Sequence, residues 1–112
     1  MKIFNSLLIT TCLLLGFAAC TPEAPKVRVQ NQNQEIVDVA LKPPSGSTIN
    51  INDVSAGNET SYIEVPSSNY EVDVNVENVS SNITTFFQAD EDGNYTIVVS
   101  NASPPSVRVN KQ

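Results

Sequence analysis

Glu71-Val72-Asp73-Val74-Asn75-Val76 alternates valines with two acids and an amide. Successive side chains of a β-strand point to opposite faces of its sheet. The valines would therefore face an apolar core while the polar side chains face water, as in a strand of a half-exposed antiparallel sheet. This segment predicts an all-β fold, and no apolar stripe of helical period appears in residues 26–112.

Similar short runs follow one another along the chain. They lie at residues 27–29, 37–39, 49–51, 63–65 and 107–109, with further β-prone runs at 84–87 and 95–99. The run Tyr95–Val99 is apolar on both faces, so we expect it in the centre of a sheet. Turn-forming residues separate the runs, at residues 43–46, 56–58, 66–69, 90–94 and 103–105. Among them, Asp92-Gly93 is typical of a tight hairpin that needs a positive φ.

This spacing predicts seven or eight short strands in a small antiparallel β-sandwich of Ig-like or Greek-key topology. A small barrel is the alternative. The chain has 112 residues, and residues 26–112 suffice for a single domain with one modest core.

The first twenty residues have the pattern of a secretion signal. Met1-Lys2 gives a positive start, and the apolar stretch from Ile3 to Ala19 ends in small residues, as in a signal peptide rather than a membrane span. Phe17-Ala18-Ala19-Cys20 follows a different rule from ordinary signal cleavage, which needs a small residue where Phe17 stands. It resembles the bacterial lipobox, although leucine is the usual first residue there. An ordinary cut after Ala18, leaving Cys20 as a free thiol, is the alternative.

The lipobox resemblance implies that residues 1–19 are removed and that Cys20 becomes a lipid-bearing N-terminus. More than one acyl chain on Cys20 would suffice for stable anchoring to a membrane. Residues 20–25 would be the lipidated N-terminus and tether, kept extended by two prolines over at most about 18 Å. The expected location is the cell envelope, after secretion across the inner membrane. Thr21, in place of an aspartate, favours the outer membrane.

The chain after residue 20 is strongly acidic. Five cations remain against twelve carboxylates, a net charge of −7. Such a surface repels nucleic acid and anionic headgroups, so we expect no nucleic-acid partner. Cys12 would leave with the signal peptide, and no pair of cysteines would remain to form a disulfide.

Several segments resemble a family of bacterial envelope domains with Ig-like or transthyretin-like sandwiches and no known function. The resemblance covers about residues 26–102 and rests on short strand-and-turn motifs. They are Val27-Arg28-Val29-Gln30-Asn31, Val37-Asp38-Val39, Asn52–Gly57 leading to Ser61-Tyr62, Val65-Pro66 before Tyr70–Val74, and Gly93–Val99. Family members usually have glycine where Asn69 stands, and asparagine is the next-best residue for a left-handed turn. The resemblance implies a fold and names no chemistry.

Few residues are candidates for chemistry. The chain has no histidine, which excludes Ser-His and Cys-His catalytic sites, and only three glycines follow residue 20. Asp90, Asp92 and Asn94 have the alternating spacing of calcium ligands, but the glycine and glutamate that complete an EF-hand loop are absent. They are a weak calcium candidate beside the alternative of a solvated turn. No cofactor is expected.

Two further groups have alternative interpretations. Glu71, Asp73 and Glu77 could pair as glycosidase carboxylates, or they could keep an exposed strand from aggregating. Phe86 and Phe87 cannot both face the core of one strand, so one of them is a candidate for an exposed contact. Burial of that ring at a strand end or under a loop is the alternative.

Together these patterns indicate a membrane-anchored envelope lipoprotein that is a non-catalytic binding or structural module and not an enzyme. Its partner would be an envelope protein or a polysaccharide, and the sequence leaves the oligomeric state open. The alternative function is a calcium-dependent carbohydrate binder or a carboxylate-dependent envelope hydrolase.

Overall fold

The computed structural model describes residues 21–112. The predicted signal peptide, residues 1–19, and the predicted lipid attachment at Cys20 lie outside the described residues. The described part is all-β, with eight strands. They are β1 (Lys26–Asn31), β2 (Val37–Lys42), β3 (Ile49–Val54), β4 (Ile63–Glu64), β5 (Ser68–Val76), β6 (Ile83–Ala89), β7 (Asn94–Val99) and β8 (Val107–Lys111).

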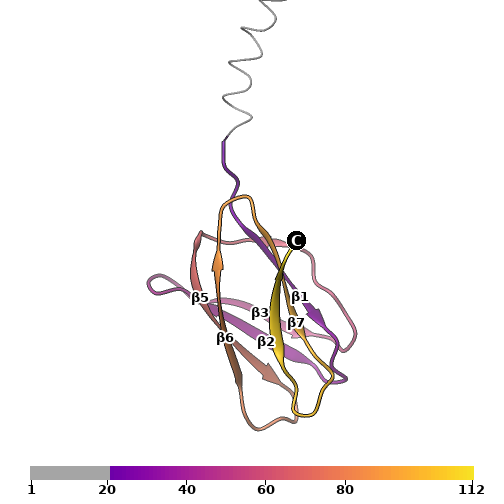
Figure 1. Ribbon diagram of the computed structural model, residues 1–112. Coiled ribbons are helices and arrows are strands. Elements are labelled where there is room, and N and C mark those ends of the chain that lie inside the picture. Colours follow the sequence, from indigo (N-terminus) through magenta and orange to yellow (C-terminus); the bar gives the residue numbers. More distant parts are fainter. Residues whose placement is uncertain (1–20) are drawn as a thin grey trace, which may run out of the picture.

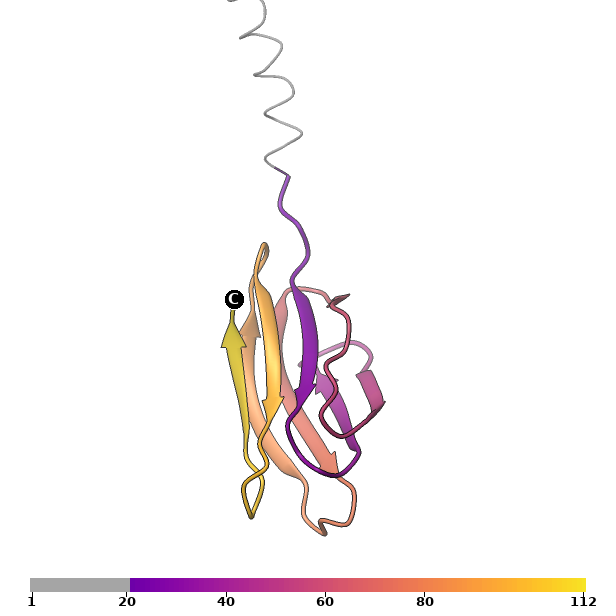
Figure 2. The ribbon, with the colours of Figure 1, turned by 90° about the vertical axis from the view of Figure 1, so that its right-hand side faces the viewer.

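The strands form two four-stranded sheets that pack as a sandwich (Figure 1). The first sheet has the order β4-β1-β7-β8 and the second has the order β3-β2-β5-β6. Figure 2 shows β8, β7 and β1 side by side in one layer. The predicted all-β sandwich is confirmed, and so is the central position of Tyr95–Val99, because β7 lies between β1 and β8.

One strand pair departs from the antiparallel expectation. β1 and β7 are parallel, in register from Lys26 opposite Asn94 to Asn31 opposite Val99. Alternation along a strand says which face is buried, and it carries no information about the direction of the neighbouring strand. The direction of β7 is instead set by the path of the chain, which crosses from β6 in the second sheet to β7 in the first and places β7 beside β1.

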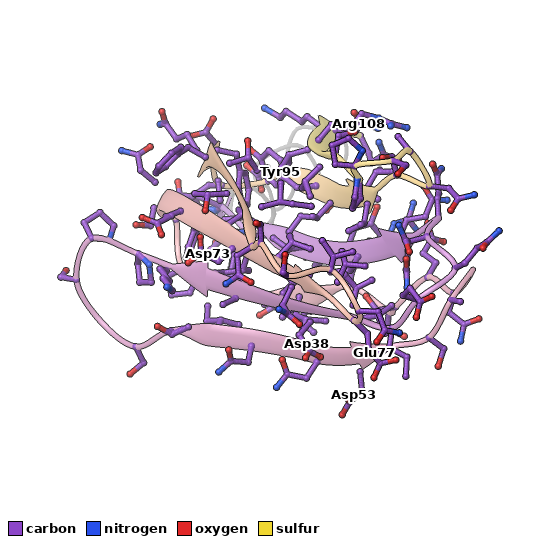
Figure 3. All side chains as sticks on the ribbon, turned by 90° about the horizontal axis from the view of Figure 1, so that it is seen from below. Asp38, Asp53, Asp73, Glu77, Tyr95 and Arg108 are labelled. Atoms are coloured by element: carbon purple, nitrogen blue, oxygen red, sulfur yellow. The ribbon has the colours of Figure 1, made fainter. Side chains whose placement is uncertain are left out.

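The core lies between the two sheets and consists mainly of valines. Each of the alternating runs supplies residues to it, as the period-two pattern predicts. The buried apolar side chains include Val27, Val29, Val37, Val39, Leu41, Tyr70, Val72, Val74, Val76, Tyr95, Ile97 and Val99. Figure 3 shows Tyr95 between the layers, with Arg108 and Asp38 on opposite outer sides.

The expected hairpin at Asp92-Gly93 is wrong. β6 belongs to one sheet and β7 to the other, so residues 90–93 cross between the layers. The positive φ, 64°, is at Asp92 rather than at the glycine. Gly93 is needed for another reason: a Cβ there would lie 2.7 Å from the Tyr95 ring, closer than atoms can approach.

The expected left-handed turn at Asn69 is also wrong. Asn69 lies within β5, where it pairs with Gln88 of β6. Within residues 21–112, the non-glycine residues with positive φ are Asp53, Asn78 and Asp92. The chain bends before β5 instead, at Ser67, and the Tyr70 hydroxyl donates across this bend to the Pro66 carbonyl at 2.6 Å.

A bulge shapes the edge of the second sheet. Between the pairs Val37–Val54 and Val39–Ile51, β2 has one residue and β3 has two. Asp53 takes a left-handed conformation there, with a φ of 59°, and its N–H donates to the Asp38 carboxylate at 2.7 Å. Bulges of this kind bend an edge strand and disturb its ladder.

Candidate functional site

The segment expected to be an extended tether is hydrogen-bonded to the domain at Glu23 and Pro25. The Glu23 N–H donates to the Asp92 carboxylate at 2.9 Å, and the Asp92 N–H donates back to the Glu23 carbonyl at 2.8 Å. Pro25 is buried, and its carbonyl accepts from the Val65 N–H at 2.9 Å. Only Thr21 and Pro22 therefore separate position 20 from the first docked residue.

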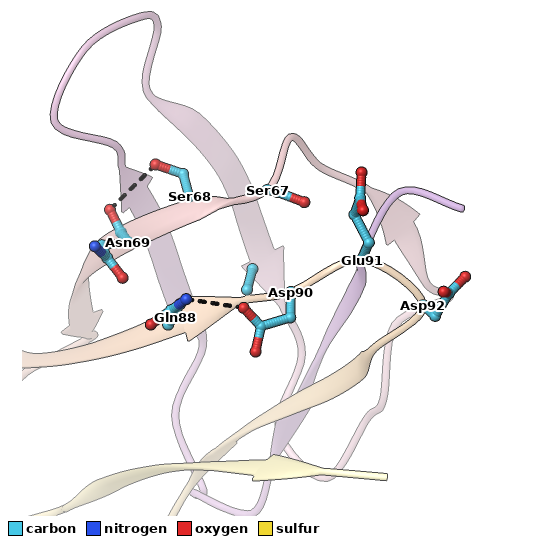
Figure 4. Close-up of a pocket in the computed structure, with 8 residues that line it drawn as sticks. Ser67, Ser68, Asn69, Gln88, Asp90, Glu91 and Asp92 are labelled. Carbon is cyan, nitrogen blue, oxygen red and sulfur yellow. Dashed lines mark hydrogen bonds between the residues drawn. The ribbon is translucent and has the colours of Figure 1, made fainter. Parts of the chain in front are cut away.

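The acidic loop that docks this segment also contains the calcium candidates. Figure 4 shows the carboxylates of Asp90, Glu91 and Asp92 pointing in different directions around a shallow polar hollow of about 540 Å³. Asp90 accepts from the Gln88 amide at 2.9 Å, and Asp92 accepts from Glu23. Asn94 lies at the start of β7, where its carbonyl accepts from the Gln112 N–H.

The Asp90 and Asp92 carboxylates thus point in different directions. Within residues 21–112, no group of three or more acidic residues is placed to hold a metal ion. Cation ligands must surround a common centre. In this loop, the Asp90 and Asp92 carboxylates instead accept hydrogen bonds from N–H groups of the protein. Calcium binding at Asp90, Asp92 and Asn94 stays a prediction.

The acidic residues expected on one strand are only partly together. Glu71, Asp73 and Asn75 share the outer face of β5, whereas Glu77 lies beyond the end of that strand. Asp73 forms an ion pair with Lys42 of β2 and accepts from the Thr84 hydroxyl of β6 at 2.8 Å. These contacts tie three neighbouring strands together on their solvent side.

The surroundings of Asp73 favour its ionised form. The hydrogen bond from Lys42 lowers the pKa of the Asp73 carboxyl, with smaller lowering contributions from Thr84 and Glu71, while partial burial opposes them. Asp73 in turn raises the pKa of Lys42 through the same hydrogen bond. A glycosidase acid needs a raised pKa in order to keep its proton at neutral pH, so Asp73 does not suit that role.

Phe86 and Phe87 divide as predicted. Phe86 is 70% exposed on the outer face of β6, the largest exposed fraction among the large hydrophobic side chains in residues 21–112. Phe87 faces inward, where it stacks on Tyr70 at 5.7 Å between ring centroids and contacts Tyr95 at 5.2 Å. The prediction that the two rings do not both face the core is confirmed. Of the two alternatives for the outer ring, exposure and burial at a strand end or under a loop, the structure has exposure.

A hollow lies on the outer face of the second sheet, beside Asp73. Its volume is about 170 Å³, and its lining includes Asp38, Ala40, Asn50, Asn52, Asp73 and Asn75. Ala40 is the smallest of these side chains. Lys42 borders this hollow and also a larger one of about 490 Å³, whose lining includes Phe86, Pro43 and Pro44.

Sequence reasoning missed two buried asparagines at the opposite end of the sandwich from Glu23. The Asn31 amide donates to the carbonyls of Glu35, Val54 and Ser55 at 2.8–3.2 Å, and its oxygen accepts from the Asn33 N–H. Asn33 donates to the Ser100 carbonyl at 2.9 Å. The available signal was that Asn31 follows Val27 and Val29 in the core-facing phase, where a polar residue needs partners.

Comparison of the chain with known protein families and with curated proteins finds no match in either. Residues 21–112 include no helix that is long and apolar enough to cross a membrane.

Proposed function

We propose that this chain is a lipoprotein of the cell envelope, secreted across the inner membrane and anchored, in the outer membrane, by lipid on Cys20. Its domain, residues 26–112, is a non-catalytic binding or structural module with a partner in the envelope. Residues 1–19 are the signal peptide that directs export.

The sequence Phe17-Ala18-Ala19-Cys20, followed at once by a docked segment, carries the proposal. Because Glu23 is hydrogen-bonded to Asp92, the chain from Cys20 to the domain has a reach of only about 10 Å. An anchor at Cys20 would then hold the domain close to the headgroups, with the acidic loop at residues 90–93 nearest the membrane.

This geometry supports a module that works at the membrane surface rather than at the end of a long arm. Both outer faces of the sandwich would stand sideways, accessible to other envelope components. Two of the three carboxylates at the docking loop, those of Asp90 and Asp92, accept hydrogen bonds from N–H groups of the chain.

Metabolic labelling with radioactive palmitate tests the anchor. The natural chain and Cys12→Ala should take up label, because residue 12 would be removed with the signal peptide. Cys20→Ala should take up none and should accumulate as an uncleaved precursor. Equal labelling of Cys20→Ala and the natural chain would contradict the proposal.

Crosslinking in intact envelopes, followed by purification of the tagged chain, tests the binding role. A reproducible protein or glycan partner is expected with the natural chain. Recovery of lipid alone would contradict a binding module.

A further inference from the structure

The outer face of the β3-β2-β5-β6 sheet has the features of a ligand-binding surface. We call it the polar face and define it by Asp38, Ala40, Asn50, Asp73, Thr84 and Phe86. Its middle row runs straight across all four strands, since Asn50 is opposite Ala40, Ala40 is opposite Asp73, and Asp73 is opposite Thr84. Four strands at the usual spacing give a row about 14 Å long.

The polar face is hollowed in its middle. Ala40 is a small residue between the longer Asn50 and Asp73, and the hollow over it holds about 170 Å³. The second hollow, of about 490 Å³, continues past Lys42 to Phe86. Lys42 lines both hollows. We call the two hollows together the trough, which has amides and carboxylates at one end and an exposed aromatic ring at the other.

The groups lining the trough are rich in hydrogen-bond acceptors. Carboxylates only accept, and each asparagine adds a carbonyl oxygen. Among the described residues, the Asn50 and Asn52 side chains have no hydrogen-bond partner within the protein, whereas Asn75 is paired with Asn82 at 3.0 Å. A ligand with many hydroxyl donors matches this lining.

The charges on the polar face restrict the ligand further. Asp38, Glu71 and Asp73 oppose a single cation, Lys42, which is already paired with Asp73. An anionic polymer would meet net repulsion along the trough. An uncharged ligand would meet none, and its apolar ring face could pack on Phe86, which is 70% exposed.

We propose that the trough on the polar face binds an unbranched strand of neutral sugars. Hydroxyl groups would donate to Asp38, Asn50 and Asn52 over Ala40, and one sugar ring would stack on Phe86. This inference rests on the proposed envelope-binding role and names the class of its ligand.

Calorimetric titration of the full chain, purified in detergent, tests the inference. The probes are neutral hexasaccharides, cellohexaose and N-acetylated chitohexaose, and the acidic hexamer of galacturonate. At least one neutral hexamer should bind with a dissociation constant of about 1 mM or tighter, and the galacturonate hexamer should not. Failure of both neutral probes, or equal binding of the acidic one, would overturn the inference.

Two variants place the binding on the trough. Phe86→Ala should weaken binding by about tenfold or more. Ala40→Gln keeps the charge, fills the hollow from the solvent side, and should abolish binding. Ile63→Ala is the matched control, because it shortens an exposed apolar side chain on the other sheet; it should leave binding unchanged.

Melting temperatures of all three variants must stay near that of the natural chain. Binding that survives both Phe86→Ala and Ala40→Gln would overturn the inference. So would light scattering that showed a dimer broken by Phe86→Ala without glycan binding, since the face would then belong to a second copy. Palmitate labelling is read separately, so loss of glycan binding with normal labelling rejects this inference and leaves the anchor proposal intact.

Discussion

Tyr70 joins a turn to the core through one side chain. Its ring is 1% exposed and stacks on Phe87, while its hydroxyl donates to the Pro66 carbonyl four residues earlier. Burial raises the pKa of this phenol above its ordinary value. The arrangement is similar to the tyrosine corner of Ig-like sandwiches, in which a tyrosine hydroxyl bonds back to the chain just upstream.

Replacing Tyr70 by phenylalanine should cost about 1–2 kcal/mol of the free energy of unfolding, because the ring is kept and a hydrogen bond is lost. Urea denaturation at neutral pH measures it. An unchanged midpoint would mean that water replaces the hydroxyl at the Pro66 carbonyl without loss.

Gly93 is required by a close contact rather than by its φ. The Tyr95 ring occupies the place where a Cβ would stand, and the Tyr95 hydroxyl accepts from the Asp90 N–H at 2.9 Å. Gly93 and Tyr95 are buried at the end of the crossing between β6 and β7, whereas residues 90–92 are exposed.

Gly93→Ala should destabilise the fold by about 1–3 kcal/mol through overpacking against Tyr95. The matched test is the same change in a Tyr95→Val background, where the added methyl group has room and should cost much less. Equal costs in the two backgrounds would show that the contact does not limit residue 93. Thermal or urea unfolding of the four proteins completes the cycle.

At the scale of the elements, strand pairing is supported on the solvent side as well as in the core. Lys42, Asp73 and Thr84 connect β2, β5 and β6 through an ion pair and a hydrogen bond. Opposed and diagonal pairs of this kind favour one register, since a slip of one residue would separate them and expose the valines.

The Asp73 contacts should make stability depend on pH. Its pKa in the folded chain is below the ordinary 3.8, so the folded state binds this proton less readily than the unfolded state. The stabilisation is therefore complete above pH 3.8 and is lost as the pH falls through the folded-state pKa.

Asp73→Asn should be less stable than the natural chain at pH 7 and should lose less further stability between about pH 5 and about pH 2. Urea midpoints across that range measure both effects. Glu64→Gln, on the other sheet, is the control and should keep the natural pH dependence. Parallel curves for Asp73→Asn and the natural chain would contradict the assignment.

At the scale of the whole molecule, the N-terminal segment and the domain behave as one body from Glu23 onward. Reciprocal hydrogen bonds join Glu23 to Asp92, and the Lys26 N–H donates to the Gly93 carbonyl at 2.9 Å. The carboxyl end of the chain lies at the same end of the sandwich, because the Gln112 N–H donates to the Asn94 carbonyl.

Asp92→Gly should release the first docked residue, because glycine tolerates the positive φ but has no carboxylate. Amide hydrogen exchange at Glu23, measured by NMR, should become faster by about tenfold or more. Asp92→Asn retains an acceptor oxygen and tolerates the same φ, so exchange should stay near the natural rate. Unchanged exchange in Asp92→Gly would show that the carboxylate does not hold the segment.

Much of this fold could be predicted from local patterns. Alternation in residues 71–76 and its repeats identified the strands, their buried faces and the interior position of Tyr95–Val99, because side-chain direction in a strand depends only on position along the chain. The same reasoning predicted that Phe86 and Phe87 would not both face the core.

The tertiary structure alone decided the relations between distant residues. The parallel pairing of β1 with β7 and the docking of Glu23 on Asp92 join segments about seventy residues apart. The crossing at Asp92-Gly93 sends two consecutive strands into different sheets. No local pattern specifies which segments meet. The trough beside Ala40 arises in the same way. A small residue becomes a hollow only when strands on both sides place longer side chains around it, and that depends on sheet order and register.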